Sequence, residues 1–311
     1  MHDASQKVGV FIPVYNAGVD LPRLLDSLHL TSLDADVIIV DSSSSDGSAE
    51  VARRYTPYVT VIDKNEFDHG GTRQKMVEDN SAYDICVFMT QDAYLASPEA
   101  IARIVEAFDD PSVGAVCGRQ LPHLDANPLA QHARYFNYPD AFQKKSWEDR
   151  ERYGIKTAFM SNSFSAYRRK ALLEAGGFPS KLILSEDMYI AARMLQKGWS
   201  IVYSNTAVCH HSHNYSIVEE FKRYFDIGVF HHDQAWIGEA LGGAGGEGLR
   251  YVKSEISFLI KQKHWLWLPR SLVTCAAKLA GYKLGKLYQR LPMSLVRKLS
   301  MHTRYWGNQE K

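Results

Sequence analysis

Short apolar runs separated by segments of helical spacing constrain the fold of this chain more than any other feature. The runs cover residues 8–13, 37–40, 59–62, 85–89, 113–117 and 199–203. Each run is too short for a helix and ends at polar residues, which is typical of strands buried on both faces. Helices are expected between them, over residues 21–28, 49–55, 70–80, 99–108, 168–176 and 186–198. This alternation predicts an α/β fold built on a doubly wound parallel sheet.

Asp92 lies just beyond the carboxyl end of the expected strand 85–89. In open α/β sheets, ligands bind at that edge of the sheet. A carboxylate there suits a divalent cation held together with a phosphorylated ligand. The alternative role is an N-cap for the helix that follows, but Ser97 suits that position better. We therefore favour a functional role for Asp92.

The remainder of the chain departs from the strand and helix alternation. Residues 122–157 are rich in aromatic and charged side chains, and we expect a helical or irregular excursion over the sheet, as in a lid. Residues 216–311 are expected to be mostly helical, with one flexible break at the glycine-rich stretch 242–246.

Charge is distributed unevenly along the chain. Residues 250–311 contain 13 of the 36 Lys and Arg residues and 2 of the 35 Asp and Glu residues, a net charge of +11, which leaves −10 on residues 1–249. Residues 251–288 also interleave tryptophan and leucine with lysine, as helices in a membrane interface do. The alternative is a helix packed on the body with a solvated basic face. We expect an anionic membrane surface as a partner and no nucleic acid, because no nucleic-acid-binding motif is present.

Several features indicate the cellular compartment. The four cysteines show no paired spacing, which favours reduced thiols in a cytosolic protein. The first residues lack the basic and apolar regions of a signal peptide, and no apolar run reaches the roughly 18 residues of a spanning helix. We expect a cytoplasmic protein that binds peripherally to the inner face of the plasma membrane.

An ordered set of short motifs resembles the family 2 glycosyltransferases, which have the GT-A fold. In chain order the motifs are Pro13-Val14-Tyr15-Asn16, the stretch 40–47, Gly176-Gly177-Phe178, Ser185-Glu186-Asp187, Gly198-Trp199 and a last strand leading to histidine. Residues 67–73, 90–93 and 211–215 further resemble the bacterial rhamnosyltransferase branch. The motifs extend over residues 8–215, so the resemblance implies a Rossmann-like, nucleotide-sugar-binding sheet in residues 1–215. Residues 216–311 would form a separate helical, basic region.

The resemblance implies a set of residues that bind the donor. These are Pro13, Tyr15, Asp41, Ser42, His69, Gly71, Arg73, Gln91, Asp92 and Glu186. If the resemblance is set aside, Pro13 could simply end a strand and Tyr15 could be a packed aromatic residue. The turn before Arg73 could likewise be a simple glycine turn. Ser42 stands where the commoner family pattern has a second acid, so the nucleobase stays open.

The metal site and the base also follow from the resemblance. Asp92 matches the second acid of the family's Asp-x-Asp motif, while Thr90 replaces the first. His211 and His213 would complete a site for Mg²⁺ or Mn²⁺; a zinc site with Cys209 is disfavoured by the crowded spacing. Asp187 matches the catalytic base. For Asp187 and Glu186 the competing role is stabilisation of a helix N-terminus.

The implied activity is inverting transfer of a sugar from a nucleotide donor. The branch implies dTDP-L-rhamnose as donor and a growing lipid-linked glycan of the bacterial surface as acceptor, contacted by residues 122–165. The alternatives are transfer of galactose or N-acetylglucosamine from a UDP donor, and a nucleotide-sugar-binding protein without catalysis. A nucleotidyltransferase would need a basic glycine-rich loop after the first strand, which Asn16-Ala17-Gly18 is not.

Overall fold

A nine-stranded mixed sheet forms the centre of the computed structural model, which describes residues 6–243 and 246–307. The strands are β1 (Val8–Val14), β2 (Asp36–Asp41), β3 (Val59–Val61), β4 (Ile85–Met89), β5 (Tyr94–Leu95), β6 (Val113–Leu121), β7 (Gln143–Lys145), β8 (Phe164–Arg168) and β9 (Ser200–His210). Their order is β3-β2-β1-β4-β8-β6-β9-β5, and β7 pairs with β9. Later strands therefore lie on both sides of β1: β2 and β3 on one side, and the others on the other side.

The sheet is mixed, which corrects the prediction of a parallel sheet. Strands β3, β2, β1 and β4 are parallel neighbours, and β6 pairs parallel with β9. Strand β8 runs antiparallel between β4 and β6, and the short strands β5 and β7 pair antiparallel with β9. The sequence of β8 does not form an apolar run, because Ser165 and Arg168 interrupt it. Both polar groups are satisfied locally: the Ser165 hydroxyl donates to Asn162 at 2.9 Å, and Arg168 donates to backbone carbonyls. Because its polar side chains form hydrogen bonds within the protein, β8 can be buried without the apolar run that indicates the other strands.

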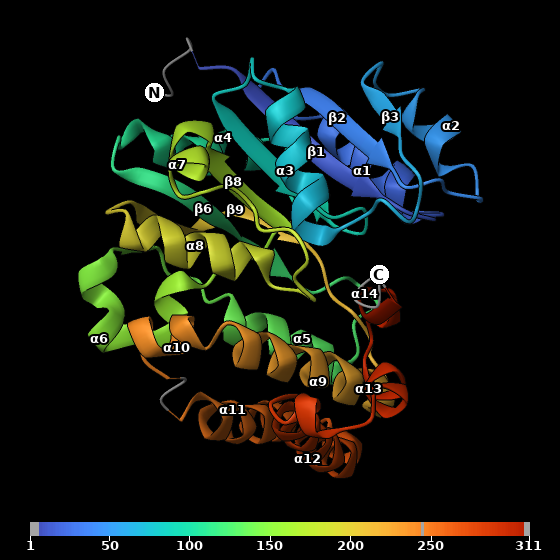
Figure 1. The fold of residues 1–311 in the computed structure, drawn as a ribbon, viewed down its shortest axis with the longest axis vertical. Helices are drawn as coiled ribbons and strands as arrows, with labels where there is room; N and C mark the ends of the chain where they lie inside the picture. The colour runs from blue at the N-terminus through green and yellow to red at the C-terminus, as the bar shows by residue number, and fades with distance from the viewer. Residues whose placement is uncertain (1–5, 244–245, 308–311) are drawn as a thin grey trace.

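Alternate residues of each central strand enter different hydrophobic clusters. Phe11 and Phe88 face one side of the sheet, and Ile12 and Val87 face the other. This is the period of two that a buried strand imposes. Helices α3, α7 and α8 cover the first side, and α1 and α4 cover the second (Figure 1). Their bounds are α1 (Asp20–His29), α3 (His69–Asp79), α4 (Ala100–Val105), α7 (Arg169–Glu174) and α8 (Glu186–Gln196), with a short α2 (Ser48–Ala52) beside β2 and β3.

A second helical layer lies beyond α8, at the bottom of Figure 1. It contains α5 (Pro128–Asn137), α6 (Arg150–Tyr153), α9 (Ile217–Asp233), α10 (Ala235–Leu241), α11 (Glu247–Lys261), α12 (Leu268–Gly285), α13 (Met293–Leu299) and α14 (Thr303–Gly307). Short 3-10 helices lie at Glu106–Asp109, Trp147–Asp149, Gly154–Ala158, Trp265–Trp267 and Tyr288–Arg290. Phe225 and Val229 of α9 belong to the same buried cluster as Phe88, so this layer is continuous with the core of the sheet.

The sequence predictions of the helices agree with the structure. The predicted excursion at 122–157 contains α5, α6 and the short strand β7, and the region after 216 is helical. Of the predicted break at 242–246, residues 244–245 lie outside the described residues; α10 ends before it and α11 begins after it. None of the helices in the described part of the chain combines the length and apolarity needed to cross a membrane.

Glycines allow α9 and α12 to approach each other closely. A Cβ atom at Gly281 of α12 would meet the carbonyl oxygen of Phe221, and one at Gly285 would meet that of Phe225. Gly228 of α9 would likewise meet the carbonyl of Tyr282. Because the blocking atoms belong to the backbone, neither helix could accommodate a side chain there without moving.

We predict that Gly281→Ala lowers the free energy of unfolding by about 1–3 kcal/mol, the usual cost of overpacking a well-packed contact. Gly248→Ala in α11 is the matched control, because a Cβ atom at Gly248 meets nothing within 4 Å. That control should leave stability unchanged or raise it slightly, since alanine favours a helix over glycine. Urea denaturation of the two variants measures the difference. Equal effects of the two substitutions would contradict the close approach of α9 and α12.

Candidate active site

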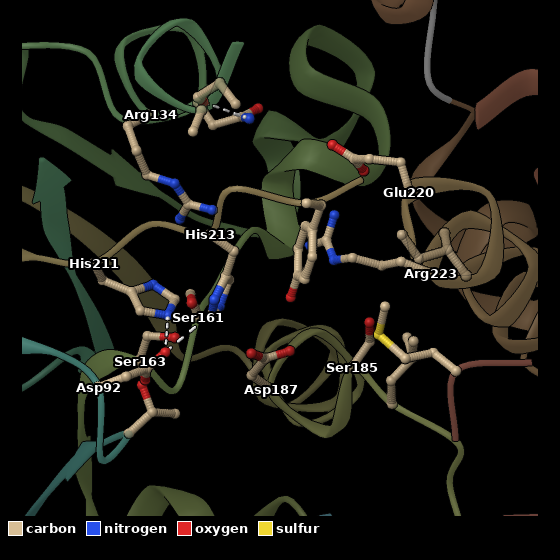
Figure 2. Close-up of a pocket in the computed structure, with 18 of the residues that line it drawn as sticks. Asp92, Arg134, Ser161, Ser163, Ser185, Asp187, His211, His213, Glu220 and Arg223 are labelled. Atoms are coloured by element: carbon tan, nitrogen blue, oxygen red, sulfur yellow. Dashed lines mark hydrogen bonds and ion pairs between the residues drawn. The ribbon is translucent and has the colours of Figure 1, made fainter. Parts of the chain in front are cut away.

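A cavity of about 750 Å³ opens at the carboxyl ends of β1 and β4. The chain passes to β2 on one side of β1, and β4 lies on the other side, so this is the point where the strand order reverses. Such a switch point is the usual ligand site of an open α/β sheet. Side chains from α5, α8, α9 and α12 form the opposite wall and point toward the same space (Figure 2).

Asp92, His211 and His213 meet on the sheet side of the cavity (Figure 2). The Asp92 Oδ2 atom lies 3.4 Å from Nε2 of His211 and 3.6 Å from Nε2 of His213. One oxygen and two nitrogens within 4.8 Å of one another form a donor set that fits a divalent cation. Both histidines predicted from the sequence are therefore positioned to bind a metal ion.

Neighbouring groups orient the histidines. The Nδ1 atom of His211 lies 2.9 Å from the side-chain oxygen of Gln120, an acceptor, which favours the neutral tautomer with the proton on Nδ1 and leaves the lone pair of Nε2 for a metal ion. Tyr215 stacks on His213 with ring centroids 4.8 Å apart. Directly after Tyr215, Ser216 and Glu219 form a capping box that starts α9 and fixes the end of this loop.

The charge states of the three groups agree with a metal site. Burial raises the pKa of Asp92, but hydrogen bonding to His211 and the charges of both histidines outweigh it, and the net pKa lies below its usual range. Burial lowers the pKa of His211, and burial together with the neighbouring His211 lowers that of His213 to about 4. At neutral pH the site therefore offers one carboxylate and two neutral imidazoles, the forms that bind metal ions.

Asp187 lines the cavity at the start of α8, while its neighbour Glu186 points into the protein. Glu186 forms a buried ion pair with Arg73 at 3.1 Å and accepts a hydrogen bond from the side chain of Asn162 at 2.9 Å. The backbone N–H groups of Asn162 and Met188 donate to Asp187 at 3.1 and 2.7 Å. The residue before the pair, Ser185, has a left-handed backbone with φ of 63°, which turns the chain sharply into the helix.

The two neighbouring acids have opposite pKa shifts. Burial, followed by the charge of Glu186, raises the pKa of Asp187 to about 7. For Glu186, burial favours the neutral acid, but the charges of Arg73 and His69 and the hydrogen bond from Asn162 hold its pKa below the usual range. A carboxylate that titrates near neutral pH and faces a cavity is suited to general-base chemistry.

Hydrogen bonds connect the ends of β1 and β4 beside the candidate metal ligands. The backbone N–H of Tyr15 donates to the side chain of Gln91 at 2.7 Å, and the Gln91 amide donates back to the carbonyl of Tyr15 at 3.1 Å. At the end of β2, Asp41 and Ser42 are buried, and the Oδ2 atom of Asp41 and the hydroxyl of Ser42 have no partner among the described residues. Unpartnered buried polar atoms are costly unless a ligand or water completes them.

The structure brings most of the predicted site residues to one cavity. Those that line it are Pro13, Tyr15, His69, Arg73, Gln91, Asp92, Asp187, His211 and His213. Four others, Asp41, Ser42, Gly71 and Glu186, lie outside its lining. The N–H of Gly71, a residue predicted to bind the donor, instead donates to the Oδ1 atom of Asp68 at 2.6 Å, because Asp68 is the N-cap of α3.

The wall opposite the sheet was not predicted residue by residue. It includes Arg134, Tyr215, Glu220, Arg223, Tyr251 and Lys278. Three other lining residues were also not predicted: Ser161 and Ser163 lie just before β8, beside Asp92, and His302 lies between α13 and α14. The predicted lid at 122–157 does contain Arg134, and the predicted motif 211–215 contains Tyr215. Glu220, Arg223, Tyr251 and Lys278 are single polar residues in the helices α9, α11 and α12, and only the packing of those helices brings them to the cavity.

Known proteins resemble this chain both in sequence and in fold. The family model described as Glycosyl transferase family 2 matches residues 9–176. The "O-antigen chain rhamnosyltransferase RfbN" of Salmonella typhimurium is 50% identical over 304 residues, covering 97% of this chain and 96% of that protein. The "O-antigen chain rhamnosyltransferase WbaN" of Salmonella anatum is also 50% identical, with coverage of 96% and 95%.

Solved glycosyltransferases share the fold at low sequence identity. The mannosyltransferase PcManGT of Pyrobaculum calidifontis, solved with GDP-Man and Mn²⁺, superposes with a TM-score of 0.58 at 18% identity, covering 100% of this chain and 90% of that one. S. aureus TarS with UDP-GlcNAc superposes with a TM-score of 0.54 at 14% identity and 92% coverage of both chains. The predicted GT-A architecture is thereby confirmed. On the family match and the two relatives of nearly equal length, this chain belongs to the family 2 glycosyltransferases.

Proposed function

We propose that the protein transfers L-rhamnose from dTDP-L-rhamnose to a growing O-antigen chain, with inversion at the anomeric carbon. The observation that carries the proposal is the 50% sequence identity, over nearly the whole chain, to two proteins named O-antigen chain rhamnosyltransferases. The cavity supports it, because a candidate metal site and a carboxylate with a raised pKa face one space. The competing donors are UDP-galactose and UDP-N-acetylglucosamine, and the competing role is nucleotide-sugar binding without catalysis.

In the proposed mechanism, Asp187 accepts the proton of the acceptor hydroxyl as that oxygen attacks the anomeric carbon. Its backbone hydrogen bonds from Asn162 and Met188 hold the carboxylate toward the cavity. Glu186 and Arg73 act through Asp187, because their buried pair fixes the start of α8 and keeps a negative charge beside the base. Asp92, His211 and His213 would hold Mg²⁺ or Mn²⁺, which when bound neutralises charge on the diphosphate leaving group.

We further propose that residues 216–311, besides lining the cavity, bring the enzyme to a lipid-linked acceptor at the cytoplasmic face of the membrane, beside the GT-A region formed by residues 1–215. Trp265 and Leu266 are exposed at the turn between α11 and α12, with 63% and 95% of their surface accessible. Arg270, one helical turn away, donates to the carbonyl of Tyr215 at 3.4 Å, and Tyr215 stacks on His213. Arg270 also lies 5.2 Å from the centre of the Trp267 ring, so the turn that carries the exposed tip is connected to the loop of the candidate metal ligands.

The donor is tested by a screen of nucleotide sugars with nucleoside diphosphate release as the signal. We expect turnover of dTDP-L-rhamnose to exceed that of the UDP sugars, and to require Mg²⁺ or Mn²⁺. Asp92→Ala should remove the metal dependence of donor binding measured by calorimetry, because the site would keep only two imidazole ligands. Preference for a UDP sugar would overturn the donor assignment, and equal donor affinity with and without metal in both proteins would overturn the metal role.

We predict that Asp187→Asn reduces turnover by about 10²- to 10⁴-fold while donor affinity changes little, because the amide cannot accept a proton. In the wild type, activity should rise as pH increases through about 7, since Asp187 must be ionised to act and its pKa is raised to about that value. Asp34→Asn is the control, because Asp34 is exposed and precedes β2, at the end of that strand opposite to the site. A variant at Asp187 with near-normal turnover would exclude this residue as the base.

The membrane contact is tested by replacing the exposed apolar tip. The double variant Trp265→Ser and Leu266→Ser should sediment less with vesicles containing anionic lipid, because it loses the side chains that would enter the interface. Val19→Ser is the control, since Val19 is also exposed, at 86%, but precedes α1 at the opposite end of the chain. Residual binding should weaken with salt, as exposed charges are screened over about 8 Å at physiological ionic strength. Equal sedimentation of all three proteins would refute the tip as a membrane contact.

A further inference from the structure

The C-terminal segment Ser300–Trp306 returns to the sheet at the point where the strand order reverses. Asp226 of α9 holds it in place: one carboxylate oxygen accepts the backbone N–H groups of Met301 and His302 at 2.9 and 3.1 Å. Asp226 and Ser300 are fully buried, and Trp306 is 1% exposed. A buried carboxylate bound to two backbone groups, with an anchored residue at each end, fixes the path of this segment.

The segment contacts two residues on the sheet side of the cavity. The ring of His302 packs edge-on against His69, with centroids 5.2 Å apart, and both rings line the cavity. The guanidinium of Arg304 lies 5.1 Å from the centre of the Tyr15 ring and donates to its hydroxyl at 3.3 Å. Because Tyr15 follows β1 and is bound to Gln91 after β4, Arg304 stands directly beside the switch point.

A second cavity of about 600 Å³ lies along the same segment. It is lined by residues 67–69, 181–183 and 301–305, and it shares Phe67, His69, Met301 and His302 with the first cavity. Asp68, an acidic residue in the lining, accepts hydrogen bonds from the backbone N–H groups of Gly71 and Lys181. Neither Lys181 nor Arg304 forms a salt bridge with a carboxylate of residues 6–243 or 246–307. The free charge around this cavity is therefore positive, which favours an anionic ligand.

We propose that the segment Ser300–Trp306 is the outer wall of the donor nucleotide site, and that Arg304 binds the nucleoside diphosphate part of the donor. The inference rests on the proposed function, because it takes the switch-point cavity as the donor site. A guanidinium carries five N–H donors in a planar fork that suits phosphate oxygens. The hydroxyl of Tyr15 accepts from one of its nitrogens and leaves the others for a ligand. Asp226 is a positioning residue that acts through the backbone of the segment.

The test is calorimetry of dTDP, UDP and GDP with the full-length protein in the presence of Mg²⁺. Arg304→Ala should weaken binding of the nucleotide that the wild type binds by about tenfold, the order expected for a lost charge-assisted contact. It should raise the donor KM with little change in kcat. Lys298→Ala is the matched control, an exposed cation of the same tail that precedes the segment. Arg304→Lys keeps the charge without the fork and should recover binding only in part.

A second variant separates ligand contact from folding. Asp226→Asn should also weaken nucleotide binding, because the amide holds the segment less firmly, and thermal melting of each variant shows that it is folded. Nucleotide affinity in Arg304→Ala equal to that of the wild type and of Lys298→Ala would overturn the inference. A wild type that binds UDP or GDP in place of dTDP would instead refute the donor assignment, while the same comparison of variants would still test Arg304.

Discussion

The buried ion pair between Arg73 and Glu186 is the interaction on which the geometry of the site depends. It joins α3, which follows the edge strand β3, to α8, which carries the proposed base Asp187. The side chain of Asn162, just before β8, also donates to Glu186. Both charged groups are nearly inaccessible to water, so removal of either partner would leave an uncompensated buried charge, at a cost of about 3–5 kcal/mol. The pair therefore holds Asp187 at a fixed position relative to the ends of the strands.

The same pair also determines the chemistry of Asp187. Glu186 remains ionised because Arg73 compensates its charge, and its negative charge acts on the neighbouring carboxyl. Two adjacent acids in one helical turn thus have different roles: one is structural and charged, and the other titrates near neutrality and faces the cavity. Differences in environment, not in residue type, separate the two roles. The helix N-terminus that both acids occupy is compatible with this division, since it stabilises negative charge.

The chain encloses its site with segments that are far apart in sequence. The ends of β1 and β4 supply Tyr15 and Asp92, and the two histidines follow the long strand β9. The helices after residue 216 contribute the facing wall, and the last described residues return to Tyr15 across 289 positions of sequence. Glycines between α9 and α12 permit this arrangement because they let the helices of the second layer pack closely. The helical region is therefore structurally part of the site as well as a candidate membrane contact.

The sequence by itself determined the parallel strands, most helices and the residues at the strand ends, because apolar runs and short motifs are local properties of the chain. Asp92, Asp187 and the histidines after β9 could be identified in this way, and they meet at one cavity. Only the tertiary structure decided that β8 is antiparallel, that Arg73 is neutralised by Glu186, and that Arg304 lies on Tyr15. These contacts depend on distances between segments that are far apart in sequence, and the periodicity of residues along the chain does not indicate such distances. A lone arginine in a helix has the same local pattern whether it is solvated, paired or directed at a ligand.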